Sequence, residues 1–147
     1  PYLVLAGGKG WLDSGIYKKA EELGRGDLVK FTEYVPDEML CPLMCGALAF
    51  VFPSIYEGFG MPPLEAMACG VPVLTTHAAS LPEVVGEDAV VTDPYSPEDI
   101  AAGLERLYTD EALRQRLKAA GPKRAAQFTW ERSAEQLYAV YQEACRE

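Results

Sequence analysis

Short apolar runs alternate along most of the chain with segments whose apolar residues recur at helical spacing. A helix-type segment follows each of these runs, and the order strand, helix, strand is typical of right-handed parallel crossovers. The pattern therefore predicts an α/β fold with a doubly wound, Rossmann-like parallel sheet whose strands are buried on both faces. The apolar runs that we assign to strands are residues 2–6, 28–31, 48–52, 71–75 and 89–92.

Glycine, proline and polar capping residues set the predicted ends of the helices between these strands. Prolines follow the loop after the third strand and a glycine ends the next helix, which is the usual asymmetry of helix ends. Ser80 and Glu83 have the spacing of a capping box, which predicts a short helix after the fourth strand. The predicted helices are residues 13–23, 37–46, 62–70 and 80–86.

The last third of the chain predicts helices alone. Ser96 and Thr129 are suited to cap two of them, and we expect the helix that begins at Glu111 to stop at Gly121 and Pro122. The final helix carries an apolar stripe, which predicts a buried face. The residues of this stripe are Trp130, Ala134, Leu137, Tyr138 and Tyr141. The basic residues between positions 114 and 124 are interpreted as a solvated helix face.

Length and charge narrow the class of protein. A chain of 147 residues with 49% apolar and 24% charged residues is long enough for one globular domain. The net charge of −9 argues against binding to nucleic acid or to an anionic membrane surface. The sequence has no apolar run near the roughly 20 residues that a membrane helix needs and no signal peptide, so we expect a cytoplasmic protein.

The cysteines and the single histidine are candidates for metal or redox chemistry. The chain contains Cys41, Cys45, Cys69 and Cys145 but no CxxC pair, and its one histidine is His77. This spacing supplies too few ligands for a structural zinc site, so reduced, buried thiols are the preferred interpretation. His77 follows a predicted strand, and a hydrogen-bonded loop residue is favoured there over a catalytic one.

Residues 53–65 form the loop with the richest chemistry, because it joins a buried strand to the start of a helix. Gly58 and Gly60 let backbone N–H groups turn toward a ligand, and the helix adds the positive end of its dipole. These features predict an anion or diphosphate site, with a simple tight turn as the alternative. Glu57 and Glu65 flank this predicted anion site, and carboxylates accept paired hydrogen bonds from sugar hydroxyls. A nucleotide-sugar therefore suits both the anion site and the two acids.

Several motifs in this region and beyond it resemble the retaining glycosyltransferases of family 4, the group 1 type, which have the GT-B fold. The segment EGFGMP at residues 57–62 and the segment EAMACGVPV at residues 65–73 resemble the E-x7-E signature of that family and its continuation. The later segments SLPE, DP and FTW resemble further landmarks. The segment YVP at residues 34–36 resembles the G-Y-V-P loop of the family, with Glu33 where glycine is usual.

The resemblance implies roles for individual residues. Glu57 would be the catalytic residue near the transferred sugar, and Glu65 would bind the ribose hydroxyls of the donor. The other implied donor-binding residues, through backbone groups or loop positions, are Gly8, Val35, Phe59, Gly60 and Met61. The implied reaction is retaining transfer of a hexose from GDP-mannose or a UDP- or ADP-hexose to a glycan or lipid-linked acceptor. No metal or other cofactor is expected, since no acidic pair has DxD spacing.

The resemblance also bears on domain organisation. Residues 1–147 would form a single nucleotide-sugar-binding domain that begins after the first strand of the family's C-terminal domain, without the N-terminal acceptor domain. We therefore expect little transferase activity from the chain alone and self-association at the exposed sheet edge. The full-length enzyme would be cytoplasmic or peripheral to a membrane.

Two other functions remain open on the sequence. The first is a noncatalytic, doubly wound module that binds other proteins, for which the acidic composition is suitable. The second is a different GT-B enzyme, such as an epimerase or a phosphorylase. The turn GGKG at residues 7–10 is not interpreted as a phosphate-binding P-loop, because the glycine spacing and the following serine or threonine are missing.

Overall fold

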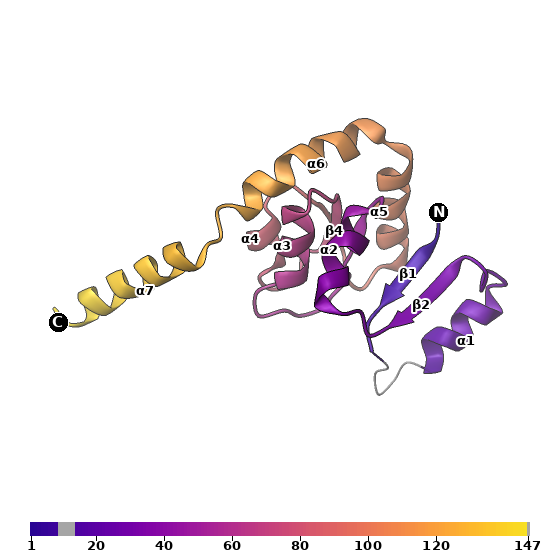
Figure 1. Ribbon diagram of the computed structural model, residues 1–147, viewed down its shortest axis with the longest axis horizontal. Coiled ribbons are helices and arrows are strands. Elements are labelled where there is room, and N and C mark those ends of the chain that lie inside the picture. The colour runs from indigo at the N-terminus through magenta and orange to yellow at the C-terminus, as the bar shows by residue number, and fades with distance from the viewer. Residues whose placement is uncertain (9–13, 147) are drawn as a thin grey trace. The chain divides into compact units, whose positions relative to one another are not determined.

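A computed structural model describes residues 1–8 and 14–146 of the chain. Lys9 and Gly10 are the last two residues of the GGKG turn, and both lie outside the described residues. The chain divides into two compact units, Pro1–Pro42 and Leu43–Glu147, and each is described by itself (Figure 1).

The first unit contains a pair of parallel strands and a helix. Strand β1 (Leu3–Ala6) pairs in parallel with strand β2 (Val29–Glu33), with Leu3 opposite Val29. Helix α1 (Ser14–Glu22) connects them, and the Tyr17 ring stacks on Phe31 of β2 at a centroid distance of 4.2 Å. Helix α2 (Asp37–Cys45) begins in this unit and runs through Pro42 into the second.

The second unit contains a parallel sheet in the order β3-β4-β5, with helices after every strand. These strands are β3 (Phe50–Val51), β4 (Val73–Thr76) and β5 (Val90–Thr92). The helices are α3 (Met61–Ala68), α4 (Leu81–Val85), α5 (Pro97–Thr109), α6 (Glu111–Ala125) and α7 (Trp130–Ala144). The alternation confirms the predicted parallel α/β fold, with the described strands paired in two groups.

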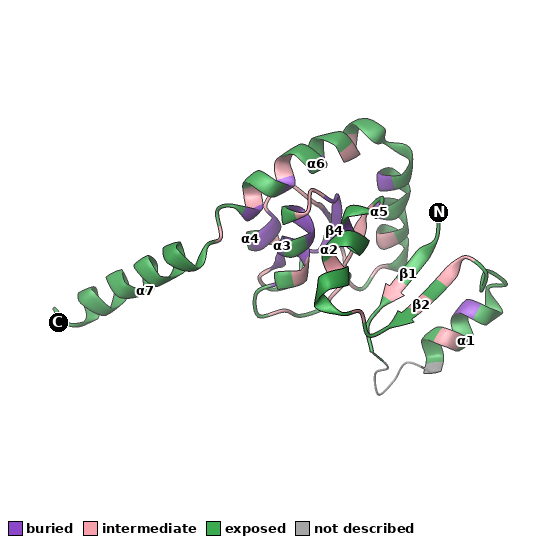
Figure 2. Ribbon diagram, viewed as in Figure 1, coloured by how far each residue is buried: buried purple, intermediate pink, exposed green. Residues whose placement is uncertain are grey.

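The core of the second unit lies around β4 and α3, which Figure 2 colours largely as buried. All four residues of β4 are buried, because this strand has a neighbour on each edge and helices against it. Met67 of α3 and Val85 of α4 are fully buried on one side of this core, and Leu107 and Leu117 are almost completely buried on the other. Complete burial of one such side chain contributes about 1.5–3 kcal/mol.

Helix α6 does not stop at Gly121 and Pro122 as predicted, but continues to Ala125. The reason is tertiary packing against α3. A Cβ atom at Gly121 would lie 3.1 Å from the carbonyl oxygen of Met67, so the glycine allows the two helix backbones to approach closely. This contact overrides the local tendency of glycine and proline to end a helix.

The prediction of a buried stripe on the last helix is wrong for this chain. Of the residues of α7, all of which the structure describes, none is buried (Figure 2). Trp130 is 82% exposed and Tyr138 is 63% exposed. The predicted cap is confirmed, since the Thr129 hydroxyl oxygen accepts a hydrogen bond from the Arg132 N–H at 3.1 Å. The local signal therefore set the start of the helix, whereas burial of its stripe needs a packing partner.

Two of the basic residues assigned to a solvated face have structural contacts instead. Arg114 Nη1 donates to the carbonyl oxygens of Leu107 and Tyr108, each at 2.8 Å, near the end of α5. Arg124 Nε donates to the Val84 carbonyl at 3.0 Å, and its guanidinium also reaches the carbonyl of Glu83. Both arginines thus satisfy carbonyl groups that a helix end leaves without partners.

Candidate functional site

The loop between β3 and α3 is held in place by hydroxyl groups of the neighbouring strand β4. Thr75 Oγ1 donates to the carbonyl oxygen of Phe52 at 3.1 Å, and Thr76 Oγ1 donates to that of Ser54 at 2.6 Å. Both threonines are fully buried. These bonds satisfy loop carbonyls just after β3 ends, so the path of the loop is fixed by side chains of a different strand.

Ser80 provides a second attachment for the same loop. Its hydroxyl lies 3.1 Å from the carbonyl oxygen of Glu57 and 2.9 Å from that of Phe59, and it donates to these groups. The capping box predicted for Ser80 and Glu83 is therefore wrong, because the Ser80 side chain makes no capping bond to α4. The spacing correctly marked the start of a helix, but no local pattern indicates that the hydroxyl faces a loop more than twenty residues away.

The two glutamates of the E-x7-E segment occupy different environments. Glu57 is half-buried, and its Oε1 accepts a hydrogen bond from the Ser54 hydroxyl at 2.9 Å. Glu65 lies on α3 and is exposed. Neither acid is therefore a buried carboxylate without a compensating contact. What remains is a carboxylate oriented by a serine and a second carboxylate open to solvent.

Gly60 is the N-cap of α3, and its backbone conformation suits glycine. Its φ is 101°, and a Cβ atom there would lie 2.7 Å from Cδ2 of the fully buried Leu81. The prolines that follow carry no N–H, so the helix start offers the N–H groups of Phe59, Gly60 and Met61. Within the described residues, none of these three has a backbone acceptor. Residues 59–61 therefore present donors at the positive end of the α3 dipole.

Gly8 and Val35, the predicted base-lining residues, lie in the first unit and are considered there alone. Each follows one of the paired strands, so both are at the carboxyl edge of this sheet, with Gly8 exposed and Val35 half-buried. Glu33 has a φ of 57°, in the left-handed region that glycine adopts at little cost. The Gly7 N–H donates to its carbonyl oxygen at 2.9 Å. The backbone at Glu33 thus keeps the conformation expected of glycine at this position.

His77 is an exposed loop residue. Its Nε2 lies 3.7 Å from Oδ1 of Asp93, and the side chains of the two residues are 60% and 48% exposed. The same Asp93 oxygen accepts the backbone N–H of Tyr95 at 2.9 Å. The geometry supports the interpretation of His77 as a loop residue with a carboxylate neighbour.

A cleft of about 250 Å³ lies beside the E-x7-E loop. The Phe128 ring, which lines it, meets the Phe59 ring edge to face at a centroid distance of 5.7 Å. None of the donor-binding residues predicted from the sequence lines this cleft. Its lining consists of Glu83, Arg124, Gln127, Phe128, Thr129, Arg132, Ser133 and Gln136.

Comparison with known proteins assigns the chain to a family. Residues 1–124 match the model of the glycosyl transferases described as group 1. The chain belongs to the group 1 glycosyl transferases. This confirms the resemblance noted for the EGFGMP and EAMACGVPV segments. The chain is also 42% identical over 139 residues to O-antigen chain mannosyltransferase B of Escherichia coli, which covers 95% of this chain and 36% of that protein.

Solved structures of glycosyltransferases have the same fold. Sucrose-phosphate synthase from Thermosynechococcus elongatus is 30% identical with a TM-score of 0.83, over 98% of this chain and 38% of that one. The C-terminal domain of a glycosyl transferase group 1 family protein from Francisella tularensis is 29% identical with a TM-score of 0.72, over 86% and 68%. The group 1 chain is thus Rossmann-like and related to GT-B enzymes. It spans about a third of the length of the E. coli relative.

In the described part of this group 1 chain, no helix combines the length and the apolar character needed to cross a membrane.

Proposed function

We propose that this chain is the donor-binding half of a retaining hexosyltransferase. It binds a nucleotide diphosphate hexose and presents the sugar to a glycan or lipid-linked acceptor. A mannosyl donor is favoured over a glucosyl donor, because the relative from E. coli is named as a mannosyltransferase. Family membership supports the transferase class, and the geometry of the E-x7-E loop supports the placement of the donor.

The observation that carries the proposal is the set of N–H groups at residues 59–61. Gly60 is buried, and its N–H has no backbone acceptor within the described residues. A buried polar group without a partner costs about 1–3 kcal/mol, so a ligand that accepts this hydrogen bond is favoured. The dipole of α3 adds positive potential at the same point. A diphosphate satisfies both requirements.

The two carboxylates then have distinct roles. Glu65 is exposed on α3 about one turn beyond these N–H groups, where its two oxygens accept hydrogen bonds from the vicinal hydroxyls of a ribose. Glu57 is oriented by the Ser54 hydroxyl and sits on the loop side of the diphosphate, where it contacts the hexose. Ser80 stabilises this arrangement because it holds the carbonyl groups of Glu57 and Phe59.

The same groups support the chemical step. As the bond between the anomeric carbon and the diphosphate oxygen breaks, negative charge grows on the diphosphate, and fixed N–H donors with a helix dipole stabilise it. The carboxylate of Glu57 stabilises the positive charge that develops on the sugar ring. The two carboxylates are not assigned as the acid and nucleophile of a glycosidase, because the leaving group here is already a good anion.

We also propose that the chain alone transfers sugar slowly or not at all. It spans 36% of the length of the E. coli relative, and the acceptor site belongs to the remaining part of such an enzyme. Residues 1–147 thus serve as a single donor-binding domain. Self-association through a sheet edge is part of the same proposal.

Calorimetric titration tests the donor site. The chain is titrated with GDP, UDP and ADP and then with their hexose conjugates. We expect one nucleotide to bind saturably and its affinity to fall about 10- to 100-fold in Glu65→Gln, because a charged acceptor is lost. Glu105→Gln, which removes an exposed acid on α5, is the matched control and should leave the affinity unchanged.

Absence of binding to a chain that is folded by circular dichroism would contradict the donor site. The protein-interaction module would then be the better account. Retention is tested separately, in an enzyme that contains this chain together with the acceptor-binding part. Nuclear magnetic resonance of the first product formed should show the anomeric configuration of the donor, and the opposite configuration would refute the retaining assignment.

A further inference from the structure

Exposed aromatic and polar side chains gather at the carboxyl edge of the sheet β3-β4-β5. Tyr56 lies on the loop after β3 and is 80% exposed, and Tyr95 lies after β5 and is 78% exposed. His77 directly follows β4, and Asp93 directly follows β5. Because these strands are parallel neighbours, all three loops leave the sheet at the same edge. The four residues Tyr56, His77, Asp93 and Tyr95 are named the edge patch.

The loop after β3 is tied to β4 next to the edge patch. Thr76, the last residue of β4, donates from Oγ1 to the Ser54 carbonyl oxygen at 2.6 Å. The Ser54 hydroxyl lies 2.9 Å from Oε1 of Glu57 and 3.1 Å from the carbonyl oxygen of Tyr56. The same serine therefore positions both the Tyr56 backbone and the Glu57 carboxylate. Tyr56 thus directly precedes the residue that contacts the hexose in the proposed function.

The loops after β4 and β5 are joined by a second set of contacts. The His77 N–H donates to the carbonyl oxygen of Thr92 at 3.1 Å. Asp93 Oδ1 accepts the Tyr95 N–H at 2.9 Å and lies 3.7 Å from Nε2 of His77. The Asp93 N–H donates to Oδ2 of Asp99 at 2.7 Å, in the first turn of α5. Asp93 therefore links the segments of His77 and Tyr95, while its own side chain remains partly open to solvent.

The charge of these loops is one-sided. The sequence contains no lysine or arginine between Lys30 and Arg106, and every residue of the edge patch lies in this stretch. The loops carry the carboxylates of Glu57 and Asp93, so they present negative potential to a ligand. The donor diphosphate has the N–H groups of residues 59–61 as proposed partners, whereas an anionic group over the edge patch would meet no cationic side chain of these loops. The charge pattern therefore favours a neutral ligand with hydroxyl groups.

We propose that the edge patch binds a neutral sugar ring of the glycan acceptor, an inference that rests on the proposed function. The C–H groups on one face of a hexose stack on an aromatic ring, whose π-face carries partial negative charge. Tyr56 and Tyr95 offer such rings at low entropic cost, since each side chain has only two rotatable bonds to fix. Asp93 and His77 offer hydrogen-bonding groups to sugar hydroxyls. Because the patch begins beside Glu57, an acceptor held there has its end near the hexose.

Titration with neutral trisaccharides tests the site. Mannotriose and maltotriose are added to the isotopically labelled chain, and the backbone amide signals are followed by nuclear magnetic resonance. We expect saturable shifts that are largest in the loops after β3, β4 and β5. Trigalacturonate has the same length but a carboxylate on each ring. At low salt it should bind about 10-fold more weakly than mannotriose, because the loop carboxylates repel it.

Substitution of the tyrosines separates ring stacking from other effects. Tyr56→Ala and Tyr95→Ala should each lower the affinity for mannotriose about 3- to 10-fold, whereas Tyr56→Phe keeps the ring and should keep most of the affinity. Tyr108→Ala is the matched control. Tyr108 is 55% exposed, but it lies eleven residues beyond the start of α5, about 16 Å along that helix. Circular dichroism checks that each variant folds.

The substitution Asp93→Asn tests the preference for a neutral ligand. The amide oxygen of asparagine still accepts the Tyr95 N–H, so the loop is kept while one negative charge is lost. The disadvantage of trigalacturonate should narrow from about 10-fold to about 3-fold, because one of two repelling carboxylates is gone. Glu105→Gln, which removes an exposed acid further along α5, should leave this ratio unchanged.

Three results would overturn the proposal. The first is a folded chain whose amide signals shift with neither neutral trisaccharide, or shift only outside the three loops. The second is a loss of affinity in Tyr108→Ala as large as that in Tyr56→Ala. The third is binding of trigalacturonate as tight as that of mannotriose. The titration contains no nucleotide, so its failure leaves the donor site standing, whereas failure of the donor site shows in the calorimetric titration with nucleotides.

Discussion

The substitution Gly60→Ala tests whether the start of α3 is shaped as the structure indicates. Two independent penalties act at this position. The backbone φ of 101° is one that residues with a Cβ atom rarely adopt. The new Cβ would also lie 2.7 Å from Cδ2 of Leu81, a side chain that is completely buried and therefore has no space into which to move.

The magnitude follows from these two terms. A left-handed backbone costs a non-glycine residue about 1–2 kcal/mol. Overpacking of a filled core costs about 1–3 kcal/mol. Alanine restricts the unfolded chain and returns about 0.4–1 kcal/mol. We therefore expect Gly60→Ala to lower the free energy of unfolding by about 1–4.5 kcal/mol, which is a large part of the stability of a domain of this size.

Urea denaturation followed by circular dichroism measures this loss, and two other glycines of the same unit separate its terms. Gly70 has a φ of 68° but only ordinary contacts, the nearest at 3.7 Å, so Gly70→Ala reports the backbone term alone. Gly58 has neither a positive φ nor any atom within 4 Å of an added Cβ, so Gly58→Ala should change stability by less than about 0.5 kcal/mol.

The clash with Leu81 is isolated by a double-mutant cycle. Leu81→Ala removes the atom that the new Cβ would meet, so Gly60→Ala should cost less in that background, with a coupling energy of about 1 kcal/mol or more. The reasoning is refuted if Gly60→Ala is no more destabilising than Gly70→Ala, or if the two substitutions at Gly60 and Leu81 are additive.

Three further substitutions test other features of the structure. Glu33 has a φ of 57°, so Glu33→Gly should be more stable than Glu33→Ala by about 1 kcal/mol in urea denaturation. Both variants remove the glutamate side chain, so equal stability would contradict the left-handed backbone. Ser80→Ala should cost about 1 kcal/mol and weaken nucleotide binding in calorimetry, because the loop carbonyls lose their donor; unchanged values in both assays would argue against Ser80 as the support of the loop. Arg124→Met should lower the free energy of unfolding in urea denaturation by about 1.5–3 kcal/mol, since it leaves the carbonyls of Glu83 and Val84 without their charged donor. Arg124→Lys should not restore full stability, because an ammonium lacks the guanidinium fork. Full rescue by lysine would show that charge alone matters.

Local sequence patterns predicted the order of the strands and helices and the loop that carries the proposed chemistry. Hydrophobic runs predicted the parallel strands. The expected burial on both faces is confirmed for β4 alone among the described strands, since three of the four residues of β1 are exposed. Residues 57–65 stand out from their residue types alone, and the chain starts a helix at Met61, one residue before the predicted start, with Gly60 as its N-cap. The caps at Ser96 and Thr129 were also predicted correctly, since such a cap depends only on atoms within three residues.

Contacts between distant segments decided the rest. Gly121 sits inside α6 because α3 packs against it, although its local tendency is to end a helix. The Ser80 hydroxyl bonds a loop on another connection, although its spacing is that of a cap. The last helix has an apolar stripe with no buried residue, since a stripe is buried only where another surface covers it.

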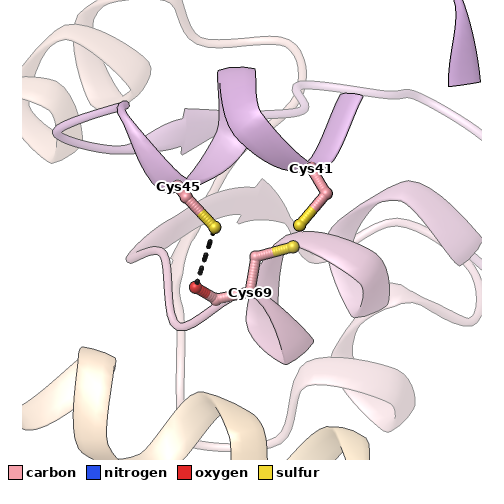
Figure 3. A group of neighbouring side chains, drawn as sticks. All are labelled: Cys41, Cys45 and Cys69. Atoms are coloured by element: carbon pink, nitrogen blue, oxygen red, sulfur yellow. Dashed lines mark hydrogen bonds between the residues drawn. The ribbon is translucent and has the colours of Figure 1, made fainter. Parts of the chain in front are cut away.

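The cysteines show the same division most clearly. Spacing along the chain places Cys41 beside Cys45, because the α-helix repeats about every 3.6 residues. It does not place Cys69, whose carbonyl oxygen accepts a hydrogen bond from the Cys45 thiol at 3.8 Å across 24 positions of the chain (Figure 3). None of the four cysteines, all of which the structure describes, is buried, so the prediction of buried thiols is wrong. The sequence by itself therefore determined which elements form and which loop carries the proposed donor chemistry. Which groups converge across 20 or more residues was decided by tertiary structure alone, because packing brings together what no local periodicity relates.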